Sequence, residues 1–111
     1  MNDRFITDEE VEKALAFLRD SALAIGAAKR DAILSERMVR HVKALVMKMY
    51  SDLPVSAQER EAYASDRFIE ACEREAEAAA EFEKLRSLRE AAAAKIEAWR
   101  TIGANYRAMK I

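Results

Sequence analysis

Proline and glycine are almost absent from this chain, and their scarcity restricts what it can fold into. The 111 residues include one proline and two glycines: Pro54, Gly26 and Gly103. Sheets and loop-rich folds need many more turn residues, because each change of chain direction uses them. Alanine, glutamate, arginine, lysine and leucine predominate instead, as they do in long helices. The sequence therefore predicts an all-α protein.

The first predicted helix covers residues 8–51. Thr7 and Glu10 flank its start at the spacing of a capping box, in which each side chain accepts a hydrogen bond from the other residue's backbone amide. Gly26 costs about 1 kcal/mol relative to alanine, and we expect it to mark a bend or a close contact without ending the helix. Apolar residues recur every three or four positions, the spacing of one helix face: Val11, Ala14, Leu18, Ala22, Ile25, Ala28, Ala32, Val39, Val42, Val46 and Met49.

Pro54 ends this helix, because proline cannot continue it and disfavours helical geometry at the residue before it. We expect a turn over residues 52–56 and a second helix over residues 57–109, which starts with another capping box at Ser56-Ala57-Gln58-Glu59. Since Ser65-Asp66 has the pattern of an internal N-cap, the sequence leaves open whether a short first helix is split off there. The apolar face of the second helix contains Phe68, Cys72, Ala79, Phe82, Leu85, Ala92, Ile96, Trp99 and Tyr106.

The short connection at Pro54 predicts an antiparallel helical hairpin that forms a single domain over residues 1–111. Charge supports this direction: residues 29–48 are mainly basic, residues 59–83 are mainly acidic, and the two outer ends reverse the pattern. Two long helices cannot enclose their apolar faces, so we expect a homodimer, as a four-helix bundle or a coiled-coil-like pair. Neither stripe keeps a strict heptad, which favours bundle-like packing over a regular supercoil.

The net charge and the cysteine content narrow the class of protein. A formal net charge of −1 argues against a dedicated nucleic-acid binder. One cysteine, Cys72, excludes an internal disulfide framework and indicates a reducing compartment. We find neither the pattern of a secretory signal nor the run of about 20 apolar residues that spans a membrane. We expect a protein of the cytoplasm that does not contact membranes.

No group of residues has the composition of a catalytic or metal site. The single histidine and the single cysteine are far apart in the sequence and are too few to hold a metal. We interpret His41 as a polar residue at the edge of a helix and Cys72 as a small apolar residue of the inner face. The glutamates between Glu73 and Glu83 are typical of a solvated or ion-paired helix face. We expect no enzymatic activity, no cofactor and no metal.

The C-terminal end mixes basic and aromatic residues and is the best candidate for a binding site. Trp, Tyr and Arg are the usual hot spots of protein interfaces, and such mixtures also contact phosphates and stack on bases. A third interpretation is that the two aromatic residues close the end of a bundle while the bases face the acidic first helix. The sequence leaves these three interpretations open for Lys95, Trp99, Arg100, Tyr106, Arg107 and Lys110.

Residues 53–68 and 85–110 resemble a family of small, uncharacterised proteins of tailed phages and prophages. The resemblance is most distinctive at Ala98-Trp99-Arg100-Thr101 and over residues 105–110. It implies a phage origin, among early genes that accompany recombination and replication, and therefore the cytoplasm of a bacterial host. We expect a non-enzymatic accessory protein that binds a protein partner or DNA. The alternative is a structural or assembly protein of the virion, such as a scaffold or chaperone.

Overall fold

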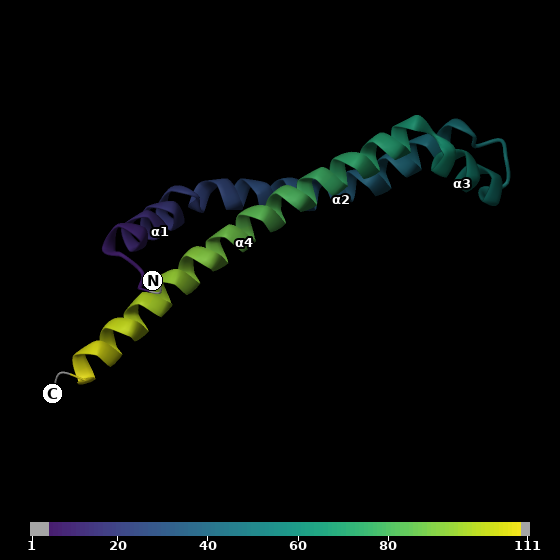
Figure 1. The fold of residues 1–111 in the computed structure, drawn as a ribbon. Helices are drawn as coiled ribbons and strands as arrows, with labels where there is room; N and C mark the ends of the chain where they lie inside the picture. The colour runs from purple at the N-terminus through teal and green to yellow at the C-terminus, as the bar shows by residue number, and fades with distance from the viewer. Residues whose placement is uncertain (1–4, 110–111) are drawn as a thin grey trace. The chain divides into compact units, whose positions relative to one another are not determined.

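The structure, a computed structural model, describes residues 5–109, which are almost entirely helical. It contains α1 (Asp8–Asp20), α2 (Ala22–Met49), α3 (Val55–Ala64) and α4 (Asp66–Met109), as Figure 1 shows. No strand occurs within this part of the chain. The predicted all-α class is confirmed. None of the described helices is both long enough and apolar enough to cross a membrane.

The first predicted helix begins as expected at Asp8, but it is not continuous to residue 51, because it is interrupted and ends at Met49. Its capping box is confirmed: the Glu10 amide donates to Thr7 Oγ1 at 3.1 Å, and the Thr7 amide donates to Glu10 Oε1 at 3.4 Å. The interruption lies at Ser21, between α1 and α2, while Gly26 lies inside α2. Ser21 Oγ donates to the Phe17 carbonyl oxygen at 2.6 Å. A serine that bonds back to the preceding turn in this way commonly bends a helix.

The capping box that the sequence predicts at Ser56 is wrong. Helix α3 begins at Val55 with Pro54 as its N-cap, so Ser56 lies within the first turn, and no side chain caps this end. The backbone of Pro54 has φ −60° and ψ 154°, which sets the start of the helix before the serine. Gln58 Nε2 instead reaches back to the Leu53 carbonyl oxygen at 2.7 Å.

Ser65 separates α3 from α4, and the alternative that the sequence left open is thereby decided. Its φ of −77° and ψ of 146° are extended. Its hydroxyl accepts a hydrogen bond from the Phe68 amide at 3.2 Å and donates one to the Ala62 carbonyl oxygen at 2.8 Å. Ser65 is therefore the N-cap of α4.

The contacts divide the chain into two units, which we describe separately. The turn unit covers residues 26–83. In it α2 runs antiparallel to the helices that follow the turn, as Figure 1 shows. The Lys29 ammonium lies 5.2 Å from the centre of the Phe82 ring, and that of Lys43 lies 4.6 Å from the Tyr63 ring. Lys43 Nζ also donates to the Tyr63 hydroxyl at 2.9 Å. This hydrogen bond raises the pKa of Lys43.

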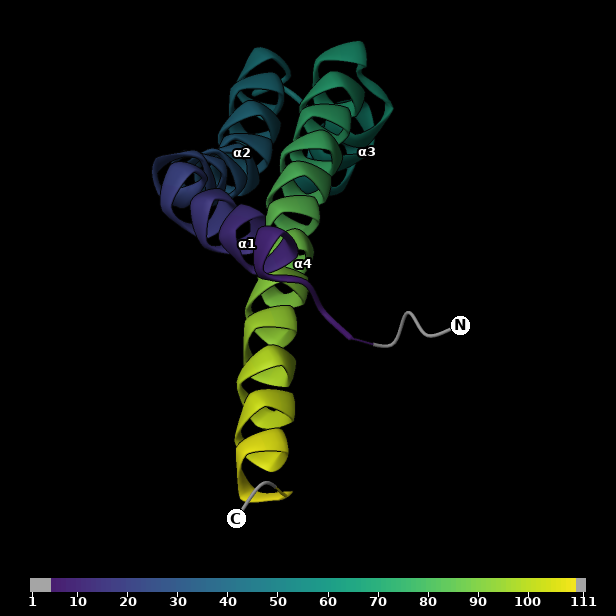
Figure 2. The same ribbon diagram turned by 60° about the vertical axis from the view of Figure 1, so that its left-hand side comes forward.

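The terminal unit covers residues 5–25 and 84–109 of the described chain, and α1 lies against α4 in it (Figure 2). Trp99, Lys95 and Arg89 of α4 make polar contacts with α1 and with Ser21, which follows it. Trp99 Nε1 donates to Asp8 Oδ1 at 3.3 Å, and Lys95 Nζ lies 3.9 Å from Glu10 Oε2. Arg89 Nη1 donates to the Leu18 carbonyl oxygen and to Ser21 Oγ, both at 2.7 Å. These pairs also run antiparallel.

The inward residues of each long helix form one narrow line, which we call its inward line. In both helices the line advances by alternating steps of three and four residues. The apolar residues alone do not show this regular spacing, because the polar residues Ser35, Glu75 and Arg89 occupy some positions of the line. Ala22, Met49, Ala79 and Tyr106, expected on these lines, are exposed. The inward line of α2 is Ile25, Ala28, Ala32, Ser35, Val39, Val42 and Val46, and that of α4 is Ala71, Glu75, Ala78, Phe82, Leu85, Arg89, Ala92 and Ile96.

The two serines provide a test of how α3 and α4 begin. We expect Ser65→Ala to lower the free energy of unfolding by about 1 kcal/mol, because it removes the cap of α4. Ser56→Ala is the matched control and should change it by less than about 0.5 kcal/mol, because Ser56 caps no helix here. Urea unfolding followed by circular dichroism measures both. A larger loss for Ser56→Ala would contradict the observed helix start.

Candidate functional site

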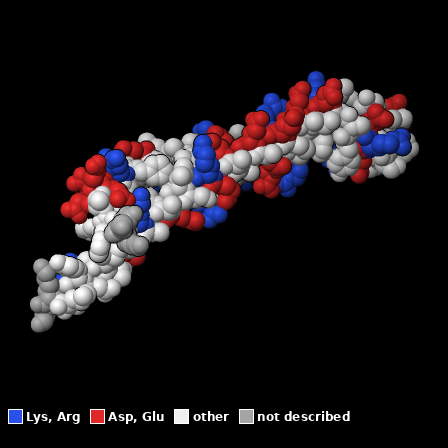
Figure 3. All heavy atoms as spheres, in the orientation of Figure 1, with Lys and Arg blue, Asp and Glu red and all other residues white. Residues whose placement is uncertain are grey.

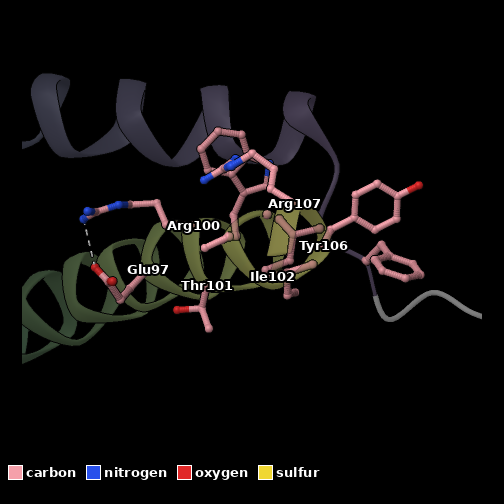
Figure 4. A pocket seen from close by; sticks show the side chains of 11 residues that line it. Glu97, Arg100, Thr101, Ile102, Tyr106 and Arg107 are labelled. Atoms are coloured by element: carbon pink, nitrogen blue, oxygen red, sulfur yellow. Dashed lines mark hydrogen bonds and ion pairs between the residues drawn. The ribbon is translucent and has the colours of Figure 1, made fainter. Parts of the chain in front are cut away.

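A groove of about 550 Å³ lies in the terminal unit, along the last turns of α4 and the segment that leads into α1 (Figure 4). Four of the residues expected to bind a partner line it together. The lining residues are Phe5, Ile6, Glu97, Trp99, Arg100, Thr101, Ile102, Gly103, Ala104, Tyr106 and Arg107.

The groove exists because α4 continues past the start of α1. Asp8, the first residue of α1, accepts the hydrogen bond of the Trp99 indole. The turns of α4 that follow Trp99 therefore extend beyond α1, as Figure 2 shows. On the N-terminal side, Phe5 and Ile6 line the groove. One wall is thus a helix and the other a short non-helical segment.

The apolar side chains of the groove prolong the inward line of α4. Ile96 is the last residue of the inward line, and Trp99, Ile102, Tyr106 and Met109 follow it at steps of three, three, four and three. Residues at this spacing share one helix face. Trp99 is 38% exposed, Tyr106 56% and Met109 83%. Exposure is thus highest at Tyr106 and Met109, the residues of the line that lie farthest beyond the start of α1.

The basic residues of the groove lie on the flank of this apolar line. Arg100 Nη1 lies 3.2 Å from Glu97 Oε1, and both side chains are 67% exposed. The Arg107 guanidinium passes over Gly103, where an added Cβ would lie 3.5 Å from Arg107 Nη1. Two guanidinium groups therefore border the apolar line, and the Glu97 carboxylate lies beside one of them.

The two other residues expected at this site are Lys95 and Lys110. Lys95 does not line the groove and faces Glu10 of α1 instead. Lys110 lies outside the described residues. The sequence analysis missed Phe5, Ile6 and Ile102. Ile102 could have been found from its spacing to Trp99 and Tyr106, but nothing in the sequence places Phe5 and Ile6 beside residues almost 100 positions away.

The groove is suited to binding an apolar side chain and a neighbouring anion.

The single histidine and the single cysteine lie outside this site. His41 is exposed and Cys72 half-buried, and both lie in the other unit. Among the described residues no three His, Cys, Asp or Glu side chains are grouped to hold a metal ion. Comparisons with models of known families, with curated proteins and with solved structures find no match to this chain.

Trp99 and Tyr106 should differ in their contribution to stability. Trp99 borders a second hollow with Val11 and Leu15 of α1, whereas Tyr106 lies beyond that helix. We expect Trp99→Ala to lower the free energy of unfolding by about 2 kcal/mol, and Tyr106→Ala by less than about 0.5 kcal/mol. Chemical unfolding of the two variants measures this difference. Equal losses would show that Tyr106 stabilises the packing of α1 on α4, which would contradict a role in binding a partner.

Proposed function

We propose that this chain is a non-enzymatic accessory protein that binds a helix of a protein partner in the groove at the end of α4. The observation that supports it is the apolar line of Trp99, Ile102 and Tyr106, which continues where α1 no longer covers α4. An amphipathic helix placed there would complete the pairing that α1 makes farther along. Helix-in-groove binding of this kind uses apolar anchors at steps of three and four residues.

The residue types of the groove support a protein partner. Trp, Tyr and Arg contribute most of the energy at protein interfaces, because they combine a large apolar area with a polar end. Arg100 and Arg107 border the apolar line and favour a partner helix with acidic residues on its flank. Such charges contribute mainly to the rate and specificity of binding.

DNA fits the groove less well than a protein does. A nucleic-acid site gathers several cations along the path of the phosphates, and here Glu97 lies beside Arg100, one of the two arginines that line the groove. The face in Figure 3 shows few charged side chains on the last turns of α4. The chain as a whole carries a formal net charge of −1.

The resemblance to tailed-phage proteins supports a place for this binding activity in phage recombination or replication, in the bacterial cytoplasm. It is strongest around Trp99–Arg100 and over residues 105–110, which overlap the groove. A role in virion assembly is the second candidate, and the many exposed apolar side chains support it, because scaffold proteins pack against many copies. Presence of the chain in purified particles would favour this second role.

Self-association is also part of this proposal. No large side chain is fully buried within the described chain, and apolar residues such as Leu34, Met38 and Leu45 are 43–54% exposed. Exposed apolar residues that lie in a row mark an interaction surface. We propose that the chain acts as a homodimer.

Substitutions in the groove test the binding site. Tyr106→Ala should weaken binding of the purified partner by about 10- to 100-fold, as loss of a hot spot does. Arg100→Ala/Arg107→Ala should weaken it by about 10-fold and reduce its salt dependence. Arg19→Ala/Arg67→Ala removes the same charge elsewhere and is the matched control.

The partner is recovered from infected cells with the parent chain, and its affinity is measured by the fluorescence of Trp99, the chain's one tryptophan. A groove variant that binds as tightly as the parent would refute the site. If the chain instead binds a DNA oligonucleotide, and this binding depends steeply on salt and is lost in the arginine variant, the partner is DNA and not a protein.

The oligomeric state is measured by light scattering. We expect a mass that approaches twice the 12.6 kDa of one chain at concentrations well above micromolar. Dilution should dissociate the dimer, because its apolar surface is limited. A mass of one chain at every concentration up to the millimolar range would refute the dimer and leave the groove unaffected.

A further inference from the structure

Helix α2 carries a second apolar row on the side away from its inward line. Leu34, Met38 and Leu45 are 54%, 43% and 43% exposed, and the exposed His41 lies between them. Their steps of four, three and four residues place them on one face, at about 100° of rotation per residue. Ala28 and Val46, which are buried, lie on a different side of the helix. We call Leu34, Met38, His41 and Leu45 the outer row.

Opposite charges end the outer row. Asp31 lies three residues before Leu34, and Lys48 lies three residues after Leu45, so both continue the same spacing. Each is exposed, and the Asp31 carboxylate lies 3.1 Å from Arg30 Nη2 in a solvent-exposed pair. From Asp31 to Lys48 the row is about 25 Å long.

This order of residues makes the row complementary to itself when it is reversed. We infer that the outer row binds the outer row of a second copy of this chain, with the two α2 helices antiparallel. In that register Leu34 packs on Leu45 of the second copy, and Met38 packs on its His41. Asp31 then faces Lys48 of the second copy, and the same pair closes the other end by symmetry. Layers of this kind are those of an antiparallel two-helix contact.

Charge favours this arrangement over a parallel one. In a parallel pair Asp31 would face Asp31, and Lys48 would face Lys48, which is repulsive at both ends. In the antiparallel pair Arg37, on the flank of the row, lies near Ala44 of the second copy, so the basic flanks do not meet. A second copy therefore satisfies both the apolar and the charged positions of the row.

The inference rests on the proposed self-association and names its surface. It is independent of the groove at the end of α4, which belongs to the terminal unit. The contact consists of few layers and lies at the small end of interface sizes, so we expect a dissociation constant of about micromolar.

A charge exchange tests the register. Asp31→Lys and Lys48→Asp should each raise the dissociation constant of the dimer by about 10-fold, because each places like charges at both ends. The double variant Asp31→Lys/Lys48→Asp should return it to within about threefold of the parent, since the pairs are restored with reversed sign. Analytical ultracentrifugation measures all four proteins. Absence of this rescue would overturn the register.

The apolar layers are tested separately. Leu34→Ser/Leu45→Ser should raise the dissociation constant by about 100-fold or more. Ile69→Ser, a matched control at a residue of α4 that is 49% exposed, should leave it unchanged. Circular dichroism verifies that each variant stays helical. If the parent is dimeric and the double serine variant is equally dimeric, the outer row is refuted while self-association stands; a monomeric parent refutes both.

Cross-linking decides the direction of the helices. With Cys72→Ser as background, Leu34→Cys/Leu45→Cys should form a covalent dimer on oxidation. Neither single cysteine variant should do so, because equivalent residues of an antiparallel pair lie about 16 Å apart, beyond the roughly 7 Å between Cα atoms that a disulfide allows. A covalent dimer from Leu34→Cys alone would show a parallel pair and overturn the inference.

Discussion

A pair of helices buries one narrow line of side chains on each helix, and this limit shapes the whole protein. The residues of these lines that are fully buried, Ala28, Val46, Ala71 and Ala92, are small, so the lines bury little apolar area. Large apolar side chains are left at the surface, among them Leu34, Leu45 and Tyr106. The chain therefore presents apolar surface that suits binding, because its own fold has no interior large enough to enclose it.

A polar residue on the inward line of α4 contacts the junction at which the first predicted helix is interrupted. Arg89 of α4 donates to the Leu18 carbonyl oxygen and to Ser21 Oγ, at the junction of α1 and α2. A charged donor at that point donates hydrogen bonds to the backbone and side-chain oxygens that an interrupted helix exposes. The junction is thus stabilised from the opposite helix as well as by the hydrogen bond of Ser21 to its own preceding turn.

The two surfaces proposed for binding differ in chemistry. The groove at the end of α4 has aromatic residues and guanidinium groups, the residue types of an interface with another kind of protein. The outer row of α2 is aliphatic with one histidine and has opposite charges at its ends, an order that matches its own reverse. Because the surfaces belong to different units, substitutions in one need not affect binding at the other.

The sequence by itself determined the helical class, the cap at Thr7, the turn at Pro54 and the apolar and basic character of the C-terminal end. These are local properties, set by backbone dihedrals, capping and spacing within a few residues. The tertiary structure decided that the first helix is interrupted at Ser21, that Lys95 faces Glu10, and that Phe5 and Ile6 complete the groove. Each of these depends on which residue lies opposite, and Arg89 and Ser21, for example, are 68 positions apart in the chain. Helical spacing shows which residues share a face, but only packing decides what that face meets.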